Sequence, residues 1–220
     1  MSRTRVKICC IQDLTEAWLA IQQGASALGL VSEMPSGPGP ISEERIAAVA
    51  AQLPPALGVF LLTCKQDADS IIEQQRRCRV NTIQLVDRVT PGVYAKLREA
   101  LPGVSLVQVI HVMDETAVDE ARRIAPLVHG ILLDSGNPNL PRKELGGTGR
   151  THNWAISRQI VDGISKPVFL AGGLRASNVA EAISVVQPYA VDVCSGVRTN
   201  GRLDVAKLKA FFEALRGTSS

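Results

Sequence analysis

The sequence has no apolar run long enough to cross a membrane. Its 220 residues are 45% hydrophobic and 20% charged, yet no run approaches the ~18 consecutive apolar residues that a spanning helix requires. The first residues, Met1-Ser2-Arg3-Thr4-Arg5, lead directly into a short apolar run and lack the long apolar segment of a secretory signal peptide. We therefore expect a globular, cytoplasmic protein without a membrane partner.

Concentrated positive charge is also missing. The chain carries 24 basic and 21 acidic residues, a net charge of +3, without a block of Lys or Arg. Proteins that bind a nucleic-acid backbone usually carry such a block. We therefore expect no nucleic-acid partner.

The residues that bind metals lack the spacing of a metal site. The cysteine count of five is odd, and the spacing is not that of paired zinc ligands. His111, His129 and His152 show no spacing typical of a metal site or a catalytic triad. We expect no metal, reduced cysteines, and histidines that are structural or face solvent.

No linker divides the chain. The stretch richest in Pro and Gly, Pro35 to Pro40, lies between a predicted strand and the helix after it. We therefore expect one domain over residues 1–220, with this stretch as a loop at the catalytic face.

Short apolar runs alternate with helical patterns along the whole chain, which is typical of repeated βα units. The predicted strands are Val6 to Cys9, Ala27 to Val31, Leu57 to Leu62, Thr82 to Val86, Leu106 to Val112, Gly130 to Asp134, Pro167 to Ala171 and Ala190 to Cys194. Predicted helices include Leu14 to Gln23, Glu43 to Gln52, Val93 to Ala100, Glu115 to Ile124 and Ala176 to Val186. Eight such units predict a (β/α)8 barrel. An open, doubly wound sheet is the alternative, because periodicity alone does not show closure.

Glycines follow the last two predicted strands. Gly172 and Gly173 come after the seventh strand, and Ser195 and Gly196 after the eighth. Glycine lets backbone N–H groups approach an anion, and barrels often bind phosphate at these two loops. We predict a phosphate site there, with ordinary turns as the alternative.

A carboxylate and a thiol end two other predicted strands. Asp134 and Cys9 would both lie at the barrel mouth, where they could serve as an acid and a base. Lys7 lies on the same side of its strand as Cys9 and would favour the thiolate. Taken alone, Asp134 could equally cap a turn, Cys9 could be a small buried hydrophobe, and Lys7 could be ion-paired in the interior. Cys10 and Cys194 are predicted to be packing residues.

Four segments together resemble the phosphoribosylanthranilate isomerase family of tryptophan biosynthesis. They are Lys7-Ile8-Cys9, Gly146-Gly147-Thr148-Gly149 with Trp154, Leu170-Ala171-Gly172-Gly173-Leu174 with Asn178-Val179, and Asp192-Val193-Cys194-Ser195-Gly196-Val197. The resemblance implies a (β/α)8 barrel, no cofactor, and an Amadori rearrangement of a phosphorylated sugar substrate. The sequence leaves both a monomer and a homodimer open. It implies Cys9 as general base, Asp134 as general acid, phosphate on Gly172, Gly173, Ser195 and Gly196, and substrate positioning by Lys7, Gln84 and Gly147.

Three positions depart from the family pattern. Gly37-Pro38-Gly39 stands where the family usually has Ser-Pro-Arg, Val86-Asp87 where it has His-Gly, and Arg198 where it commonly has Glu. The missing Arg is the expected partner of the anthranilate carboxylate, so we expect Gly39→Arg to strengthen turnover. A different sugar-phosphate substrate and a non-catalytic sugar-phosphate-binding protein are the alternatives.

Overall fold

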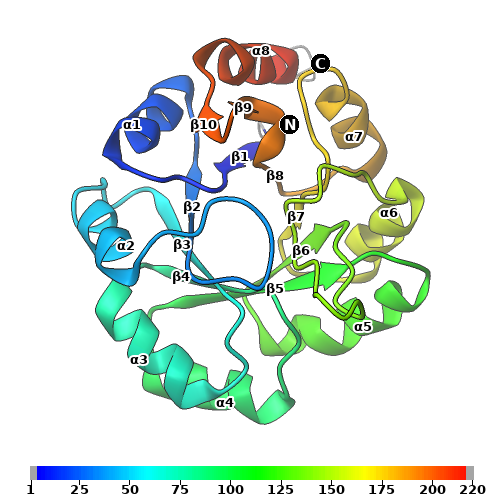
Figure 1. Cartoon of the computed structure of the whole chain (residues 1–220). Coiled ribbons are helices and arrows are strands. Elements are labelled where there is room, and N and C mark those ends of the chain that lie inside the picture. Colours follow the sequence, from blue (N-terminus) through cyan, green and yellow to red (C-terminus); the bar gives the residue numbers. More distant parts are fainter. Residues whose placement is uncertain (1–3, 217–220) are drawn as a thin grey trace.

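Eight parallel strands close into a barrel, and helices surround it (Figure 1). This computed structural model describes residues 4–216. The first strand pairs with both the second and the eighth, so the sheet has no edge. The closed (β/α)8 barrel is therefore confirmed over the open, doubly wound sheet.

The strands and helices alternate in chain order. The barrel strands are β1 (Arg5–Ile8), β2 (Ala27–Val31), β3 (Gly58–Thr63), β4 (Thr82–Leu85), β5 (Ser105–His111), β6 (Gly130–Asp134), β7 (Val168–Leu170) and β8 (Ala190–Val193). The helices are α1 (Leu14–Gln23), α2 (Glu43–Ala50), α3 (Ala68–Cys78), α4 (Pro91–Ala100), α5 (Thr116–Ile124), α6 (Trp154–Gly163), α7 (Val179–Val186) and α8 (Val205–Arg216). Single 3₁₀ turns lie at Ala125–Leu127 and Ser195–Val197, and a small hairpin joins β9 (Arg198–Thr199) to β10 (Arg202–Leu203).

Local sequence explains where α1 begins and ends. The Asp13 side chain accepts a hydrogen bond from the Glu16 N–H at 2.9 Å, which satisfies one free donor of the first turn. The helix stops at Gly24, whose φ of 104° is a left-handed conformation that suits glycine. Ala17 and Ala20 lie fully buried on its inner face.

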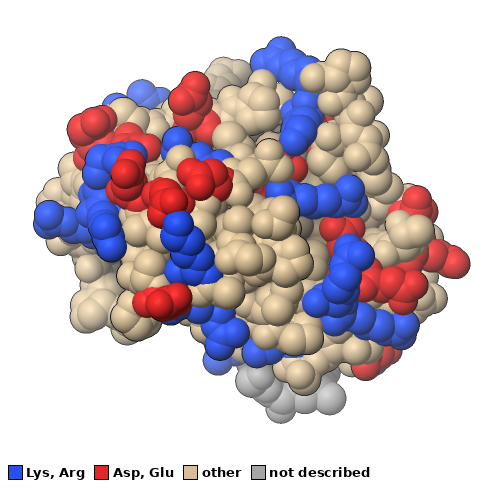
Figure 2. Space-filling view, turned by 90° about the horizontal axis from the view of Figure 1, so that it is seen from below, with Lys and Arg blue, Asp and Glu red and all other residues tan. Residues whose placement is uncertain are grey.

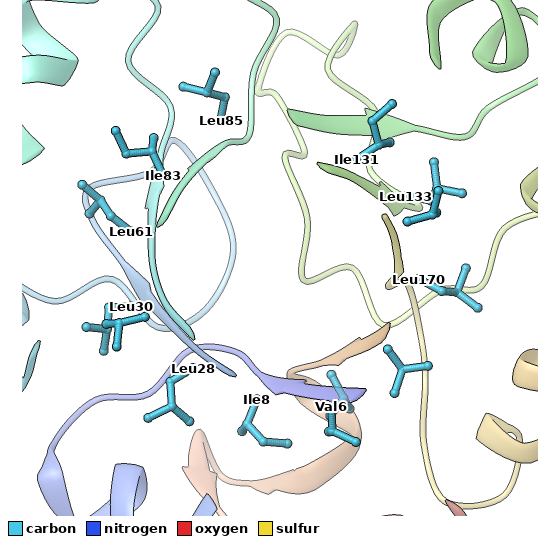
Figure 3. Packing of buried hydrophobic residues seen from close by; sticks show 14 of the residues in the cluster. Val6, Ile8, Leu28, Leu30, Leu61, Ile83, Leu85, Ile131, Leu133 and Leu170 are labelled. Carbon is cyan, nitrogen blue, oxygen red and sulfur yellow. The ribbon is translucent and has the colours of Figure 1, made fainter. Parts of the chain in front are cut away.

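Alternate residues of each strand face opposite sides of the barrel wall. One set, including Ile8, Leu28 and Leu61, points outward and packs beneath the helices (Figure 3). The other set fills the interior and includes Phe60 and Phe169, whose rings meet edge to face. The two layers hold the strand ends in fixed positions around the mouth.

Several predicted boundaries were wrong by a few residues. Cys9 and Cys194 follow β1 and β8 instead of ending them, because the chain turns there and Cys10 has a φ of 64°. Helix α7 begins at Val179, not Ala176, because the Asn178 side chain accepts from the Arg175 N–H and holds a turn. The β9–β10 hairpin was not predicted.

Basic and acidic side chains are intermixed over the face seen in Figure 2. Within residues 4–216, no helix has the length and apolar character that crossing a bilayer requires.

Candidate active site

A cavity lies at the carboxyl ends of the strands, beneath two loops. The β2–α2 loop crosses the centre of the barrel in Figure 1, and the β6–α6 loop meets it there. The Ser36 hydroxyl donates to the Lys143 carbonyl at 2.6 Å, and Arg142 Nε donates to the Pro35 carbonyl at 3.0 Å. The two loops thus form one roof over the mouth.

Most of the predicted site residues line this cavity. They are Cys9, Gln84, Asp134, Gly147, Gly172, Gly173 and Ser195. Lys7 and Gly196 do not line it. Lys7 is fully buried and paired with Asp192, which does line the cavity. Gly196 packs against the Leu174 carbonyl, which would lie 2.0 Å from an added Cβ.

Cys9 sits where β1 leaves the barrel wall, and Gly29 of β2 makes room for its side chain. A Cβ at Gly29 would lie 2.8 Å from Cys9 Sγ, so only glycine fits there. Hydrogen bonding from the Cys10 thiol and the charge of Lys7 lower the pKa of Cys9, although burial opposes this. The surroundings therefore favour the thiolate.

Lys7 is fully buried and bound to Asp192. Its Nζ lies 2.8 Å from Asp192 Oδ2, and the two residues are register partners on β1 and β8. Burial disfavours the ammonium, but the charges of Asp192 and Cys9 outweigh it and raise the pKa of Lys7. Lys7 is thus both ion-paired in the interior and close enough to act on the thiol by its charge.

Asp134 ends β6 under the glycine-rich part of the roof. Its Oδ1 accepts from the Ser135 N–H at 2.7 Å, while an added Cβ on Gly146 would lie 2.7 Å from Oδ2. Burial raises the pKa of Asp134 to about 6, against the hydrogen bond from Ser135. A carboxyl group with this pKa can hold a proton to donate near neutral pH.

Free backbone donors gather at the end of the cavity formed by the last two strands. Within residues 4–216, the N–H groups of Gly172, Gly173, Ser195 and Gly196 donate to no protein acceptor. Gly172 and Gly173 have φ values of 82° and 60°, and a Cβ on Gly173 would lie 2.7 Å from the Arg150 backbone. Such a nest of donors suits an anion with several oxygens.

The opposite end of the cavity is mainly apolar. Val31, Met34, Leu62, Val86 and Leu145 line it. Gln84 also lines it, and its buried Oε1 has no hydrogen-bond partner within residues 4–216. This end therefore offers an apolar wall with one unsatisfied acceptor.

Two residues that depart from the family pattern, Gly39 after β2 and Asp87 after β4, pack against other parts of the protein. Gly39 has a φ of 87°, and a Cβ there would lie 2.6 Å from Cys10 Cβ. Asp87 Oδ2 lies 2.5 Å from Lys143 Nζ, beside the cavity and not in it. The cavity-lining residues include no Lys or Arg.

Two features of the site were not predicted. Asp192 belongs to the family-like segment Asp192-Val193-Cys194-Ser195-Gly196-Val197, but only the β1–β8 register shows that it faces Lys7. Arg198 turns away from the cavity and forms a buried ion pair with Glu16 at 2.9 Å. The sequence signals that could have indicated this ion pair were an acidic residue, Glu16, in the first turn of α1 and a basic residue, Arg198, after β8.

The histidines occupy structural positions. His111 Nε2 lies 3.2 Å from the Val86 carbonyl, and His129 Nδ1 accepts from the Leu106 N–H at 2.9 Å. His152 Nε2 lies 2.7 Å from Ser157 Oγ, and burial lowers the pKa of His152 to about 4. In the part of the chain that the structure describes, no group of three or more His, Cys, Asp or Glu side chains could hold a metal ion.

Fold and site together define a (β/α)8 barrel with a thiol and a carboxyl group at its mouth and free backbone N–H groups at its last two loops. A family model described as N-(5'phosphoribosyl)anthranilate (PRA) isomerase matches residues 6–214. The chain belongs to this family.

Individual relatives are similar to this chain over nearly its whole length. The N-(5'-phosphoribosyl)anthranilate isomerase of Methanocella arvoryzae is 33% identical over 98% of this chain and 99% of its own. That of Moorella thermoacetica is 37% identical, over 96% and 89%. The solved phosphoribosylanthranilate isomerase of Thermotoga maritima is 29% identical, with a TM-score of 0.83 over 97% of this chain and 99% of its own. Another solved family member, in complex with reduced 1-(o-carboxyphenylamino)-1-deoxyribulose 5-phosphate, has a TM-score of 0.81 at 27% identity over 97% and 99%.

Proposed function

We propose that the protein is an aldose–ketose isomerase that converts N-(5-phosphoribosyl)anthranilate to 1-(2-carboxyphenylamino)-1-deoxyribulose 5-phosphate. Family membership over residues 6–214 supports this activity. The observation that carries the proposal for this chain is that Cys9 and Asp134 line one cavity, each with its pKa shifted in the direction that its role needs.

Asp134 is the general acid in this proposal. Its neutral carboxyl group donates a proton to the ring oxygen of the ribose, and the bond from C1 to that oxygen breaks. The anilino nitrogen supplies the electron pair and forms an iminium ion at C1. The raised pKa of Asp134 supports this role, because the proton must be present before the step begins.

Cys9 is the general base. Its thiolate removes the proton from C2, and the electrons of the C–H bond form an enamine with C1. Because C2 also carries a hydroxyl group, this enamine is an enaminol. Its tautomerisation places a proton on C1 and leaves a ketone at C2. The lowered pKa of Cys9 and the nearby charge of Lys7 support the thiolate form.

The phosphate of the substrate binds the free N–H groups of Gly172, Gly173, Ser195 and Gly196. Gln84 and Gly147 position the rest of the substrate, and Lys7 acts through its charge. Anchoring the phosphate at the β7 and β8 loops places the ribose between Asp134 and Cys9, which is the orientation that acid–base catalysis needs.

A turnover assay tests the proposal. The substrate is generated in place from anthranilate, and its consumption by the purified protein is followed by fluorescence. We expect turnover by the native chain and none above background by Cys9→Ala or Asp134→Ala. Absence of turnover by a folded native protein that still binds the product analogue would reject the isomerase and leave the sugar-phosphate-binding alternative.

A second candidate is the same reaction on an aryl amine without a carboxylate. The apolar lining and the lack of Lys or Arg around the cavity favour it. The test compares kcat/KM for phosphoribosylated anthranilate and phosphoribosylated aniline. A preference for the aniline compound would establish this narrower substrate class.

We also propose a cytoplasmic location. All five cysteines are unpaired, and three of them gather at the cavity. Reduced thiols at a catalytic centre suit a reducing compartment.

A further inference from the structure

The guanidinium of Arg198 lies behind the backbone that carries Cys9. Its Nη2 donates to the carbonyl oxygens of Cys9 and Cys10 at 3.2 and 2.5 Å, and its Nη1 donates to the Gly201 carbonyl at 3.0 Å. Arg198 is only 7% exposed and does not line the cavity. It therefore acts on the thiol through the backbone and not by touching a substrate.

Glu16 fixes the orientation of this guanidinium. Its two carboxylate oxygens accept from Arg198 Nη1 and Nη2 at 3.0 and 2.9 Å. The same carboxylate also accepts from the Gln12 and Leu203 N–H groups, at 3.1 and 2.9 Å. A planar guanidinium held on two sides can move little, so the two carbonyls that it binds are held as well.

The backbone at this point needs such support. Cys10 has a φ of 64°, a left-handed conformation that is unfavourable for residues other than glycine. From this turn the Cys10 thiol donates to the Pro38 carbonyl at 3.5 Å, and hydrogen bonding of Cys10 with Cys9 lowers the pKa of Cys9. The orientation of Cys10 is thus part of what makes Cys9 a base.

Arg198 also joins this turn to the anion site. It directly follows the Ser195–Val197 turn, whose first residue, Ser195, lines the cavity end formed by the last two strands. The Arg198 side chain therefore adds a second tie between the loop after β8 and the backbone that carries the thiol, beside the hydrogen bond from the Cys9 N–H to the Val193 carbonyl at 2.9 Å. Misplacement by about 1 Å can cost roughly a hundredfold in rate.

We propose that Arg198, oriented by Glu16, is a positioning residue that holds Cys9 in its catalytic geometry and keeps its thiol reactive. This inference rests on the proposed role of Cys9 as base. A merely structural ion pair would contribute to stability without affecting the thiol.

The decisive measurement is the rate at which iodoacetamide alkylates Cys9, followed by mass spectrometry of its peptide between pH 6 and 10. Cys64, a free cysteine that does not line the cavity, serves as the internal reference. In Arg198→Met we expect the pH midpoint for Cys9 to move upward and labelling at pH 7 to slow roughly tenfold, because thiolate reactivity follows its pKa. Arg198→Lys should show a smaller change in the same direction. The Cys64 rate should not change.

Turnover gives the second readout. We expect kcat to fall roughly tenfold to a hundredfold in Arg198→Met, with a smaller change in KM, and Arg198→Lys to recover part of the loss. Arg88→Met is the matched control, since Arg88 forms a bidentate pair with Glu120 that does not contact Cys9. It should leave both readouts unchanged.

Removing Arg198 alone leaves the Glu16 carboxylate buried without its partner, which is destabilising. The double variant Glu16→Gln/Arg198→Met removes both charges and should give a folded protein with the same slow Cys9 labelling. Wild-type Cys9 labelling and kcat in a folded variant of either kind would overturn the inference. Slow labelling in the variants of a native protein that shows no turnover would reject the proposed reaction and retain the role of Arg198.

Discussion

Lys7 and Asp192 face each other inside the barrel, 2.8 Å apart, on the two strands that close it. Both lie near Cys9 and Asp134, and their charges shift the pKa of the Cys9 thiol and of the Asp134 carboxyl group. The pair therefore links closure of the barrel to the protonation of the thiol and the carboxyl group at its mouth.

Breaking this pair should destabilise the protein and weaken the base. In Lys7→Met the Asp192 carboxylate stays buried without a partner, which typically costs about 3–5 kcal/mol. Loss of the ammonium should also move the pH midpoint of Cys9 alkylation upward. Chemical denaturation and alkylation rates measure the two effects. The control is Lys96→Met, because its exposed pair with Asp69 should be worth under about 1 kcal/mol. Equal losses in the two variants would contradict the argument.

Replacing Asp134 should remove the acid without changing the shape of the site. Asp134→Asn is expected to lower kcat by roughly a hundredfold to ten-thousandfold, the usual worth of a general acid. In the native protein, kcat/KM should fall as pH rises above about 6, where Asp134 loses its proton. A pH–rate profile checks this. A flat profile between pH 5 and 8 together with an active Asp134→Asn would rule out the role.

The same substitution should stabilise the protein at neutral pH. Asp134 has a pKa of about 6 in the folded state against 3.8 ordinarily, so folding favours its neutral form. Its ionised form therefore penalises the native state above pH about 6, by at most about 3 kcal/mol, and the penalty disappears as pH falls to the ordinary value. Thermal unfolding should show Asp134→Asn more stable than the native protein at pH 8, with the difference lost near pH 4. A constant difference would show that burial does not perturb this carboxyl.

Gly39→Arg should damage the protein instead of strengthening turnover, contrary to the expectation from the sequence. The φ of 87° strains any side chain, and a Cβ would lie 2.6 Å from Cys10 Cβ. Both Gly39→Arg and Gly39→Ala are expected to lose about 1–3 kcal/mol of stability and to lower kcat/KM. Gly92→Ala is the control, because its Cβ would meet nothing within 4 Å. Improved turnover by Gly39→Arg would show that the loop can move away from Cys10.

The Ser195 turn should hold phosphate by its backbone more than by its hydroxyl. Gly196→Ala would place a Cβ 2.0 Å from the Leu174 carbonyl and push the turn away from the β7 loop. We expect inorganic phosphate to inhibit this variant at least about tenfold more weakly. Ser195→Ala keeps the N–H groups and should lose only about two- to fivefold, the worth of one neutral hydrogen bond. The opposite order of effects would assign the phosphate to the hydroxyl.

Much of the fold could be predicted, because the same pattern of one strand and one helix repeats along the sequence. The alternation of runs gave eight units, and Cys9 and Asp134 could be placed at the mouth because all parallel strands point their ends one way. Strand ends were less predictable, since the left-handed turn at Cys10 depends on contacts from Arg198 and not on local sequence.

Contacts between distant segments were beyond prediction for a related reason. The partners Lys7 and Asp192 are 185 residues apart, and only the register of the closed barrel brings them together. Gly39 was compared with a family arginine, but a single sequence does not show that its loop packs against Cys10.

The position of β1 next to β8 has a consequence for synthesis on the ribosome. The chain emerges with Lys7 and Glu16 first, whereas their partners Asp192 and Arg198 come last. Until the final unit is made, an ammonium and a carboxylate destined for the interior have no counter-charge, so the barrel cannot close early at low cost. A nascent chain stalled before β8 should therefore stay protease-sensitive around β1, and resistance should appear only with the last segment.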